Sequence, residues 1–595
     1  MRRIAGLALV IALSIFAAFV ESFRNNLWIG YRGYESPYLG DLPVGAARPA
    51  ASQRVIIVLV RGLRLDEARA MPALNDLRNK GSALTVQHEP PAYRAPAWAT
   101  LVSGAGAEIH GVTTNNSLRA PQYSSLIHLA QSAGLAVSAV GSQSLADTMG
   151  SDAQRFEVVN NTDVAQRDDD AVRLGLDVIN DTASPPRLVL IELTAIEETL
   201  KSMPGDTAAA IKLTDARIKT LAEHIDLASS TLIILADRGI SSQGSAGGAE
   251  SDIGVTPLVM VGTGVHPGVT QLVQATDIAP TVAALLGIPL PAQAQGKPIL
   301  AALAMPATAT IAPPMANSAD VTATVVASPT LAPLPALLWS SALQLTTFYE
   351  SWSQIVHQPR FASELLRAAE TDIQAGKVQA YERFYSSVTA RADDLRMARL
   401  NTERMQRLPI IVGAALLIVA LIGVVLSGRR WQPFAGALLY AAIWFGIFNY
   451  VRDYRFSLSM FRNSDPTQFI AAVARDSAIL TTTISILIAL MTGRHEDGLE
   501  AITTVMNTLL LIVCIQLAQA VWFYFQWGNS FTWALPDSSQ LVAALVALTQ
   551  ISALSIRVVP ELPSLPMPLI IAFLALLIYS LVKQKEQAER YRRLR

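Results

Sequence analysis

The chain has 595 residues, of which 51% are hydrophobic and 16% charged, so it is long enough for several domains and too apolar to be wholly soluble. Its formal net charge of −1 provides no basic field for nucleic acid, and no nucleic-acid partner is expected. Cys514 is the single cysteine, which excludes an internal disulfide, a multi-cysteine zinc site and an iron–sulfur cluster.

The N-terminus predicts a membrane anchor over residues 1–24. Arg2 and Arg3 precede the uncharged run 4–20, whose length is at the lower limit for a membrane-spanning helix. A cleaved signal peptide also fits, but we favour an anchor because residues 19–22 match a small-residue cleavage site poorly. Positive charge before the run keeps the N-terminus inside, so the following domain is expected outside the cytoplasm, at the plasma membrane.

Residues 45–300 alternate short apolar runs with helical stretches. Strands are predicted at 55–60, 135–140, 188–193 and 232–235, and helices near 65–80 and 207–226. This alternation is typical of an α/β domain with a mostly parallel sheet flanked by helices. Ligands of such sheets gather at the carboxyl ends of the strands, so the residues after Val60, Leu193 and Leu235 form the predicted site.

Five ordered segments of this domain carry a family resemblance. They are the strand and loop 55–75, the helix and turn 96–112, the strand and turn 231–239, the return strand 256–265 and the closing helix 275–289. Together they resemble the alkaline phosphatase superfamily, in particular its type I phosphodiesterase and phosphoethanolamine-transferase branches. The resemblance covers roughly residues 54–300, and five ordered segments are more specific than any single motif.

The resemblance implies a place for a catalytic site. Active members of the superfamily use two metals, usually zinc, and a Ser or Thr nucleophile. The family's first-strand Asp ligand falls on Arg61, and its nucleophile, two residues before Pro96, falls on Arg94. In the family's Asp-His pair after the 231–235 strand, Asp237 is kept and the His is replaced by Arg238.

The remaining ligand positions are also altered. The family's Asp and His after the middle strand fall on Glu197 and Lys201, and its last His falls near Ala246. One ligand is therefore kept, one is changed conservatively and the others are lost, mainly to cations. An arginine cannot ligate a metal, since it has no free lone pair and stays protonated. We predict a degenerate site without zinc or another metal cofactor and without a catalytic nucleophile.

The cationic replacements allow two interpretations. In the first, which we prefer, the three arginines and Lys201 replace the charge of two divalent cations, with Asp237 and Glu197 as counterions, and keep the pocket neutral and folded. In the second, the cluster is an anion site in which guanidinium groups bind phosphate, sulfate or carboxylate at two points.

After the domain, the sequence predicts a tether, a stalk and a membrane bundle. Residues 301–337 are rich in Ala, Pro, Thr and Val and are typical of a semi-extended linker. Residues 338–406 have helical periodicity with breaks near 357–359 and 376, which predicts a juxtamembrane helical stalk.

The transmembrane bundle is predicted over residues 407–583. Its apolar runs are 408–427, 433–451, 477–492, 501–525, 539–557 and 566–582. If all six runs and the anchor crossed the membrane, the basic tail 584–595 would lie outside, against the positive-inside tendency. One run is therefore predicted not to span. The suspects are 539–557, which is the most polar, and 477–492.

Arg475 and Asp476 directly precede the run 477–492. We interpret them as caps of this helix at the membrane interface. The alternative is that they face the interior of the bundle. In that case they would be the one sequence feature that suggests a transporter, with the α/β domain as its accessory subunit.

The expected function is that of a membrane-anchored pseudoenzyme. It would act as a scaffold or an anion-binding subunit of an envelope assembly, with membrane-protein partners and phosphate or another anion as ligand. The rival hypothesis is an active metal-dependent phosphodiesterase or phosphoethanolamine-type transferase for envelope substrates. Its metal ligands would then be misplaced in the alignment and lie around Asp66, Glu67, Glu89 and Asp252.

Overall fold

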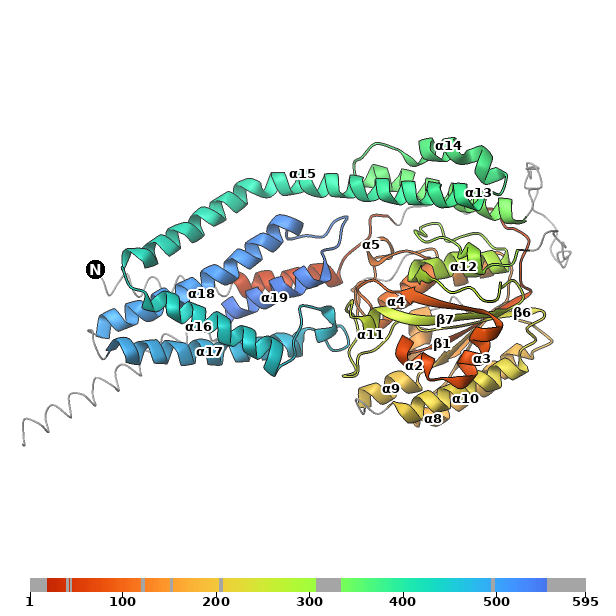
Figure 1. Cartoon of the computed structure of the whole chain (residues 1–595), viewed down its shortest axis with the longest axis horizontal. Helices are drawn as coiled ribbons and strands as arrows, with labels where there is room; N and C mark the ends of the chain where they lie inside the picture. The colour runs from red at the N-terminus through yellow and green to blue at the C-terminus, as the bar shows by residue number, and fades with distance from the viewer. Residues whose placement is uncertain are drawn as a thin grey trace, which may run out of the picture. The chain divides into compact units, whose positions relative to one another are not determined.

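A computed structural model describes residues 19–38, 42, 45–118, 123–149, 153–202, 207–305, 333–493 and 498–553. Contacts divide the chain into two compact units. An α/β unit comprises the described parts of Tyr34–Arg399 together with Thr532–Ala534. A helical unit comprises the described parts of Met1–Gly33, Leu400–Phe531 and Leu535–Arg595. Figure 1 shows the elements of both units.

A mixed eight-stranded sheet is the centre of the α/β unit (Figure 1). In spatial order the strands are β4 (Arg155–Val158), β3 (Val137–Gly141), β5 (Leu188–Leu193), β1 (Arg54–Val60), β6 (Ser230–Leu235), β7 (Val255–Gly262), β2 (Ser82–Gln87) and β8 (Leu272–Gln274). β1 runs parallel to β5 and β6, whereas β7 is antiparallel to both β6 and β2. The mostly parallel sheet confirms the predicted fold class, with β1, β3, β5 and β6 at the predicted strands.

Helices cover both faces of this sheet (Figure 1). They are α2 (Leu65–Arg69), α3 (Pro72–Lys80), α4 (Arg94–Ser103), α5 (Ala107–His110), α6 (Leu126–Ser132), α7 (Gln143–Met149), α8 (Val164–Ile179), α9 (Ala195–Ser202), α10 (Ala208–His224), α11 (Ser251–Gly254) and α12 (Ile278–Leu286). Ile57 and its alternate neighbours in β1 pack with α4, α6 and α12, while Val58 and its alternate neighbours pack with α3, α8 and α10. β1 is therefore buried on both faces, as its continuous apolar run predicts.

The helix predicted near 65–80 is two helices. α2 ends at Arg69, and Pro72 is the first residue of α3. A proline lacks the backbone N–H that a helix interior needs, but it fits the first turn, where that group has no partner. The proline therefore starts a new helix and does not continue the old one.

Further helices complete the α/β unit. α13 (Pro333–Ile355), α14 (Ala362–Gln374) and the first part of α15 (Val378–Ser427) begin and end around the predicted breaks. Leu337 of α13 joins the core beside β1, and Gln344 donates to the backbone oxygens of Ala292 and Ala294 at 2.8 and 3.1 Å. Residues up to Arg399 thus cluster with the α/β domain, whereas the sequence assigns 338–406 to a separate stalk. Most of the predicted linker lies outside the described residues.

The helical unit contains α16 (Gln432–Gly446), which a π-helical turn extends to Val451, α17 (Thr467–Gly493), α18 (Gly498–Trp527) and α19 (Ser538–Ser552). In the described part of the chain, α15 to α18 are long and apolar enough to cross a membrane. They contain four of the predicted runs, among them 477–492, which was one of the two runs suspected of not spanning. α19 has only 15 residues. The run 566–582, the tail 584–595 and most of the anchor 1–24 lie outside the described residues.

The charged pair in α17 differs from its predicted place. α17 begins at Thr467, so Arg475 and Asp476 lie inside the helix and not at its start, where caps would be. Asp476 accepts hydrogen bonds from Arg452 at 2.8 Å and from Arg475 at 3.1 Å. The predicted run began after this pair, because Arg475 and Asp476 interrupt the apolar pattern that the residues of the helix before them already carry.

Candidate functional site

Three neighbouring strands end together at the candidate site. β5, β1 and β6 are adjacent and parallel, so their carboxyl ends meet at one edge of the sheet. Arg61 follows β1, and Asp237 and Arg238 follow β6. The backbones remain close beyond the strands, where Gly62 pairs with Gly239. A Cβ on Gly239 would lie 2.0 Å from the backbone oxygen of Asp252, so only glycine allows the backbone of α11 to lie this close to the end of β6.

Arg61 is the most buried cation of the site. Its side chain is 1% exposed, and its Nε donates to Glu192 Oε1 at 2.5 Å. Its Nη1 is ion paired with Asp237 Oδ2. Burial alone would lower the pKa of Arg61, but the nearby carboxylates of Asp237, Glu192 and Glu197 outweigh it and raise the pKa above its usual value. Arg61 therefore stays charged and joins strands β1, β5 and β6.

Glu197 binds the other three cations of the site. Its Oε1 accepts from Lys201 at 2.6 Å, from Arg238 at 2.8 Å and from Arg94 at 3.0 Å. Burial would raise the pKa of Glu197, but Arg238, Arg94, Lys201 and Arg61 together hold it well below the usual value. This carboxylate is therefore ionised at neutral pH despite its burial.

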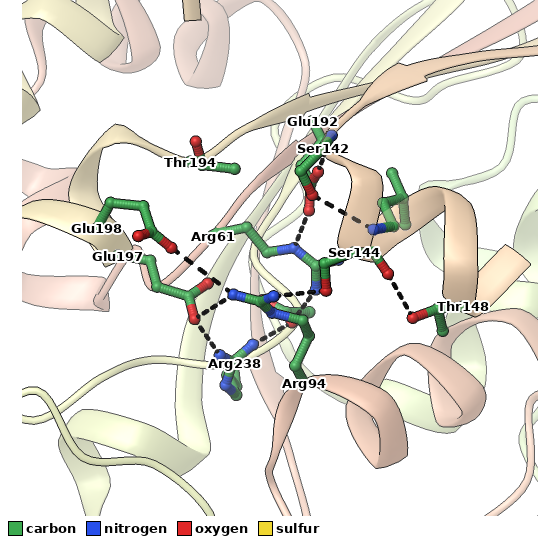
Figure 2. A network of polar contacts seen from close by, with 12 residues as sticks. Arg61, Arg94, Ser142, Ser144, Thr148, Glu192, Thr194, Glu197, Glu198 and Arg238 are labelled. Atoms are coloured by element: carbon green, nitrogen blue, oxygen red, sulfur yellow. Dashed lines mark hydrogen bonds and ion pairs between the residues drawn. The ribbon is translucent and has the colours of Figure 1, made fainter. Parts of the chain in front are cut away.

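Two more contacts belong to the network. Arg238 Nη1 is ion paired with Asp237 Oδ2, so Asp237 Oδ2 binds both Arg61 and Arg238. Arg94, the first residue of α4, also donates to Ser144 Oγ at 2.6 Å (Figure 2). All the cations predicted for the site and both predicted counterions are thus brought together.

Sequence reasoning missed the carboxylates of Glu192 and Glu198 and the hydroxyl of Ser144 as members of the network. Glu192 lies in β5, and besides Arg61 it accepts a hydrogen bond from the backbone N–H of Ser142 at 2.8 Å. A signal was present, because Glu192 is the one charged residue in the apolar run 188–193 and its side chain is only 1% exposed. A buried carboxylate requires a partner, and Arg61 on the adjacent strand provides it.

The network has a buried end and a partly exposed end. Arg61, Arg238, Asp237, Glu192 and Glu197 are buried. The side chains at the other end keep more contact with solvent, with exposed fractions of 23% for Arg94, 30% for Lys201 and 33% for Glu198. Any ligand from solution must approach through this second end.

The buried end does not fit a pair of zinc ions. Zinc needs lone pairs from imidazole, thiolate or carboxylate. Here guanidinium groups lie between the carboxylates that remain. Within the described ranges, no three His, Cys, Asp or Glu side chains gather as a metal-binding group. The chemistry of the donor set therefore disfavours the metals that the resemblance implies.

The ligands of the rival hypothesis lie in other surroundings. Asp66 and Glu67 both interact with Arg64, at 2.8 and 3.6 Å, and Glu67 also accepts from Thr207 at 3.2 Å. Glu89 is exposed, and Asp252 is half-buried on α11.

Buried histidines near the site have structural partners. His88 Nε2 is 2.8 Å from Thr256 Oγ1. His110, at the end of α5, accepts from the Val112 backbone N–H at 3.1 Å and is 3.1 Å from Thr100 Oγ1. Burial lowers the pKa of His110 to about 3, so its ring is neutral at physiological pH.

Comparison with known proteins matches part of the α/β unit to a protein family. The family model described as type I phosphodiesterase / nucleotide pyrophosphatase matches residues 55–246. A comparison with curated protein sequences finds no match. The family match confirms the predicted resemblance to the alkaline phosphatase superfamily for this segment.

Similar solved structures include a murine ectonucleotide pyrophosphatase / phosphodiesterase 5, inactive and in complex with AMP. It is 14% identical, with 40% of this chain and 95% of that chain covered and a TM-score of 0.34. A protein of the alkaline phosphatase superfamily from Vibrio parahaemolyticus is 13% identical, with 48% and 79% covered and a TM-score of 0.33. Likenesses with TM-scores this low carry no argument about the activity of this chain.

Proposed function

We propose that the domain whose residues 55–246 match the type I phosphodiesterase family works without catalysis, as a pseudoenzyme in a membrane protein. Its role is that of a scaffold or an anion-binding subunit at the outer face of the plasma membrane, with membrane-protein partners. The observation that supports this proposal is the buried network in which Arg61 and Arg238 bind Asp237. Guanidinium groups at ligand positions replace the metal charge and provide no nucleophile.

The membrane arrangement has support from the order of the chain. The tripeptide Thr532–Ala534 belongs to the α/β unit, where the Trp533 backbone oxygen accepts from Tyr38 at 2.8 Å and the Trp533 ring lies 4.3 Å from the Arg399 guanidinium. Arg399 and Trp533 must therefore be on the same side of the membrane. That requires an even number of crossings between them, and crossings by α15, α16, α17 and α18 meet this condition.

The match to a phosphodiesterase family is the observation that favours the rival function. In that case the protein is an active metal-dependent phosphodiesterase or phosphoethanolamine-type transferase. Hydrolysis would depend on carboxylates outside the network, so Glu67→Gln or Asp252→Asn would abolish it.

Purified full-length protein in detergent distinguishes these functions. We expect zinc well below one equivalent by elemental analysis and no hydrolysis of bis(p-nitrophenyl) phosphate with or without added zinc. Stoichiometric zinc together with chelator-sensitive hydrolysis would overturn the proposal. Glu67→Gln is an informative control, because a contaminating enzyme would leave the same background rate in the variant, whereas the rival site would lose its activity.

A further inference from the structure

The carboxylates of Glu197 and Glu198 are held very differently. Glu197 accepts bonds of 2.6 to 3.0 Å from Lys201, Arg238 and Arg94. Glu198 is 3.4 Å from Lys201 Nζ. It is 3.8 Å from Arg94 Nη2, a contact that Figure 2 draws. The first of these distances is long for a charged hydrogen bond and the second is beyond its range. Glu198 is therefore the weakly bound carboxylate of the network.

Glu198 is also the carboxylate that solvent can reach. Its side chain is 33% exposed, compared with 1% for Glu197, 1% for Glu192 and 0% for Asp237. Moving Glu198 away from its partners uncovers no buried charge that lacks a counterion, because Glu197 remains bonded to both Arg94 and Lys201. The energetic cost is that of an exposed ion pair, which is small.

The charges of the network define what can replace Glu198. Its cations are Arg61, Arg94, Arg238 and Lys201, and its buried carboxylates are Glu192, Glu197 and Asp237. These seven groups sum to one positive charge, which Glu198 balances. If Glu198 leaves, a singly charged anion restores neutrality at the exposed end. A doubly charged anion would leave an excess negative charge beside Glu197.

The guanidinium group of Arg94 has a fixed position that suits such a ligand. Its Nη1 donates to Ser144 and its Nη2 to Glu197, so the guanidinium plane is fixed between α7 and α9. Lys201 is fixed one turn after Glu197 on α9. Two cations with fixed positions and partial exposure match the two oxygens of one anionic group.

We propose that Glu198 is a built-in occupant of an anion site formed by Arg94 and Lys201, and that a singly charged oxyanion takes its place. The chemistry is that of a carboxylate or a phosphodiester, each of which presents two oxygens and one negative charge. This inference rests on the proposed function, because it specifies the site and the ligand class of the proposed anion-binding role. No covalent step is involved, and the exchange removes one internal ion pair and forms another.

Saturation-transfer difference NMR on full-length protein in detergent tests the exchange. The probes are acetate, dimethyl phosphate and methyl phosphate, whose methyl protons report binding directly. Methyl phosphate carries about −1.5 to −2 charges at pH 7 and serves as the doubly charged comparison. In the Glu198→Gln variant we expect acetate or dimethyl phosphate to bind about fivefold more tightly than in the unmodified protein, the effect of one exposed ion pair. Methyl phosphate should gain less.

Two further variants make the result specific. Adding Lys201→Ala to Glu198→Gln should remove the gain. Glu223→Gln changes a more exposed i,i+4 pair with Lys219 elsewhere in the α/β unit and should have no effect. Acetate binding alone identifies a carboxylate ligand, and dimethyl phosphate binding alone identifies a phosphodiester.

The inference would be overturned if Glu198→Gln, with an unchanged unfolding temperature, bound neither acetate nor dimethyl phosphate more tightly. A larger gain for methyl phosphate would also overturn it, because it contradicts the charge count. Neither result affects the metal and hydrolysis measurements, which test the proposed function separately. Hydrolysis of a bound phosphodiester would show that the anion site is present but that the pseudoenzyme proposal is wrong.

Discussion

The two ends of the ion-pair network show how differently the same residue types behave when burial changes. At the inner end, Arg61, Glu192 and Asp237 are almost fully removed from solvent and connect three strands. At the outer end, Lys201 and Glu198 are about one-third exposed and lie on one helix. The inner charges cannot be hydrated if a partner is lost, whereas the outer charges can.

This difference separates structural charges from exchangeable ones. A buried ion pair contributes little net stability compared with an apolar core, but removing only one partner is costly. The inner end therefore behaves as a unit that must be changed as a whole. The outer end can exchange a partner without unfolding the domain, so ligand binding is proposed there.

The largest expected effect is at Arg61. Arg61→Leu leaves Glu192 and the Asp237 oxygen with one cation fewer in a buried place, and we expect a loss of about 3–5 kcal/mol of stability. For a domain of this size that corresponds to a fall of about 10 °C in the unfolding temperature. Thermal unfolding of the full-length protein measures it. Asp66→Ala, which removes an exposed partner of Arg64, is the matched control with little expected change.

A double variant shows whether the loss comes from charge and not from shape. Glu192→Leu removes the carboxylate that Arg61 Nε binds, so Arg61→Leu with Glu192→Leu leaves a balanced set with Asp237 still bound to Arg238. The double variant should be more stable than the sum of the single effects predicts, by at least about 1 kcal/mol. Simple additivity would contradict the coupled network.

An intermediate effect is expected at His88, between the inner end and β7. Burial lowers the pKa of His88 to about 4, with Asp237 opposing this shift and Arg238 adding to it. An unfolded histidine titrates near pH 6.5, so the folded state binds fewer protons between about pH 6.5 and 4. Stability is therefore fully present above about pH 6.5 and falls as the pH drops, by about 3 kcal/mol near pH 4.

Unfolding temperatures measured from pH 7.5 to 4.5 test this sign. His88→Gln should flatten the acid side of the curve relative to the unmodified protein. His224→Gln changes an exposed ring that interacts only with the Thr220 backbone oxygen among the contacts described, and it is the control. Equal flattening in both variants would show that His88 is not the responsible group.

Much of the fold follows from sequence periodicity, because apolar runs and helical spacing are local properties. The strands β1, β3, β5 and β6 and the four long apolar helices are of this kind. The antiparallel β7 and the packing of α13 on the domain depend on contacts between distant segments. Gln344 of α13, for example, binds the backbone near Ala292, and no local pattern indicates that pairing.

The site was predictable to the extent that family positions specify it. Arg61, Arg94, Arg238, Asp237 and Glu197 all fall where the resemblance places them around one strand edge. Glu192 was missed because the family pattern contains no ligand at that position. A charge in a buried strand indicates that it has a partner, but not which residue the partner is. The partner of Glu192, Arg61, can be identified only once β1 and β5 are known to be neighbours.

The smallest expected effect is at Lys201, and it defines the border between the two ends. Lys201 Nζ is 2.6 Å from Glu197, but Glu197 keeps Arg238 and Arg94 if the lysine is removed. Because the lysine side chain is 30% exposed, Lys201→Ala should cost less than about 1 kcal/mol. Thermal unfolding beside Lys219→Ala, an exposed i,i+4 lysine, provides the comparison. A loss as large as that of Arg61→Leu would place Lys201 in the inner end, and Glu198 could then no longer be exchanged independently.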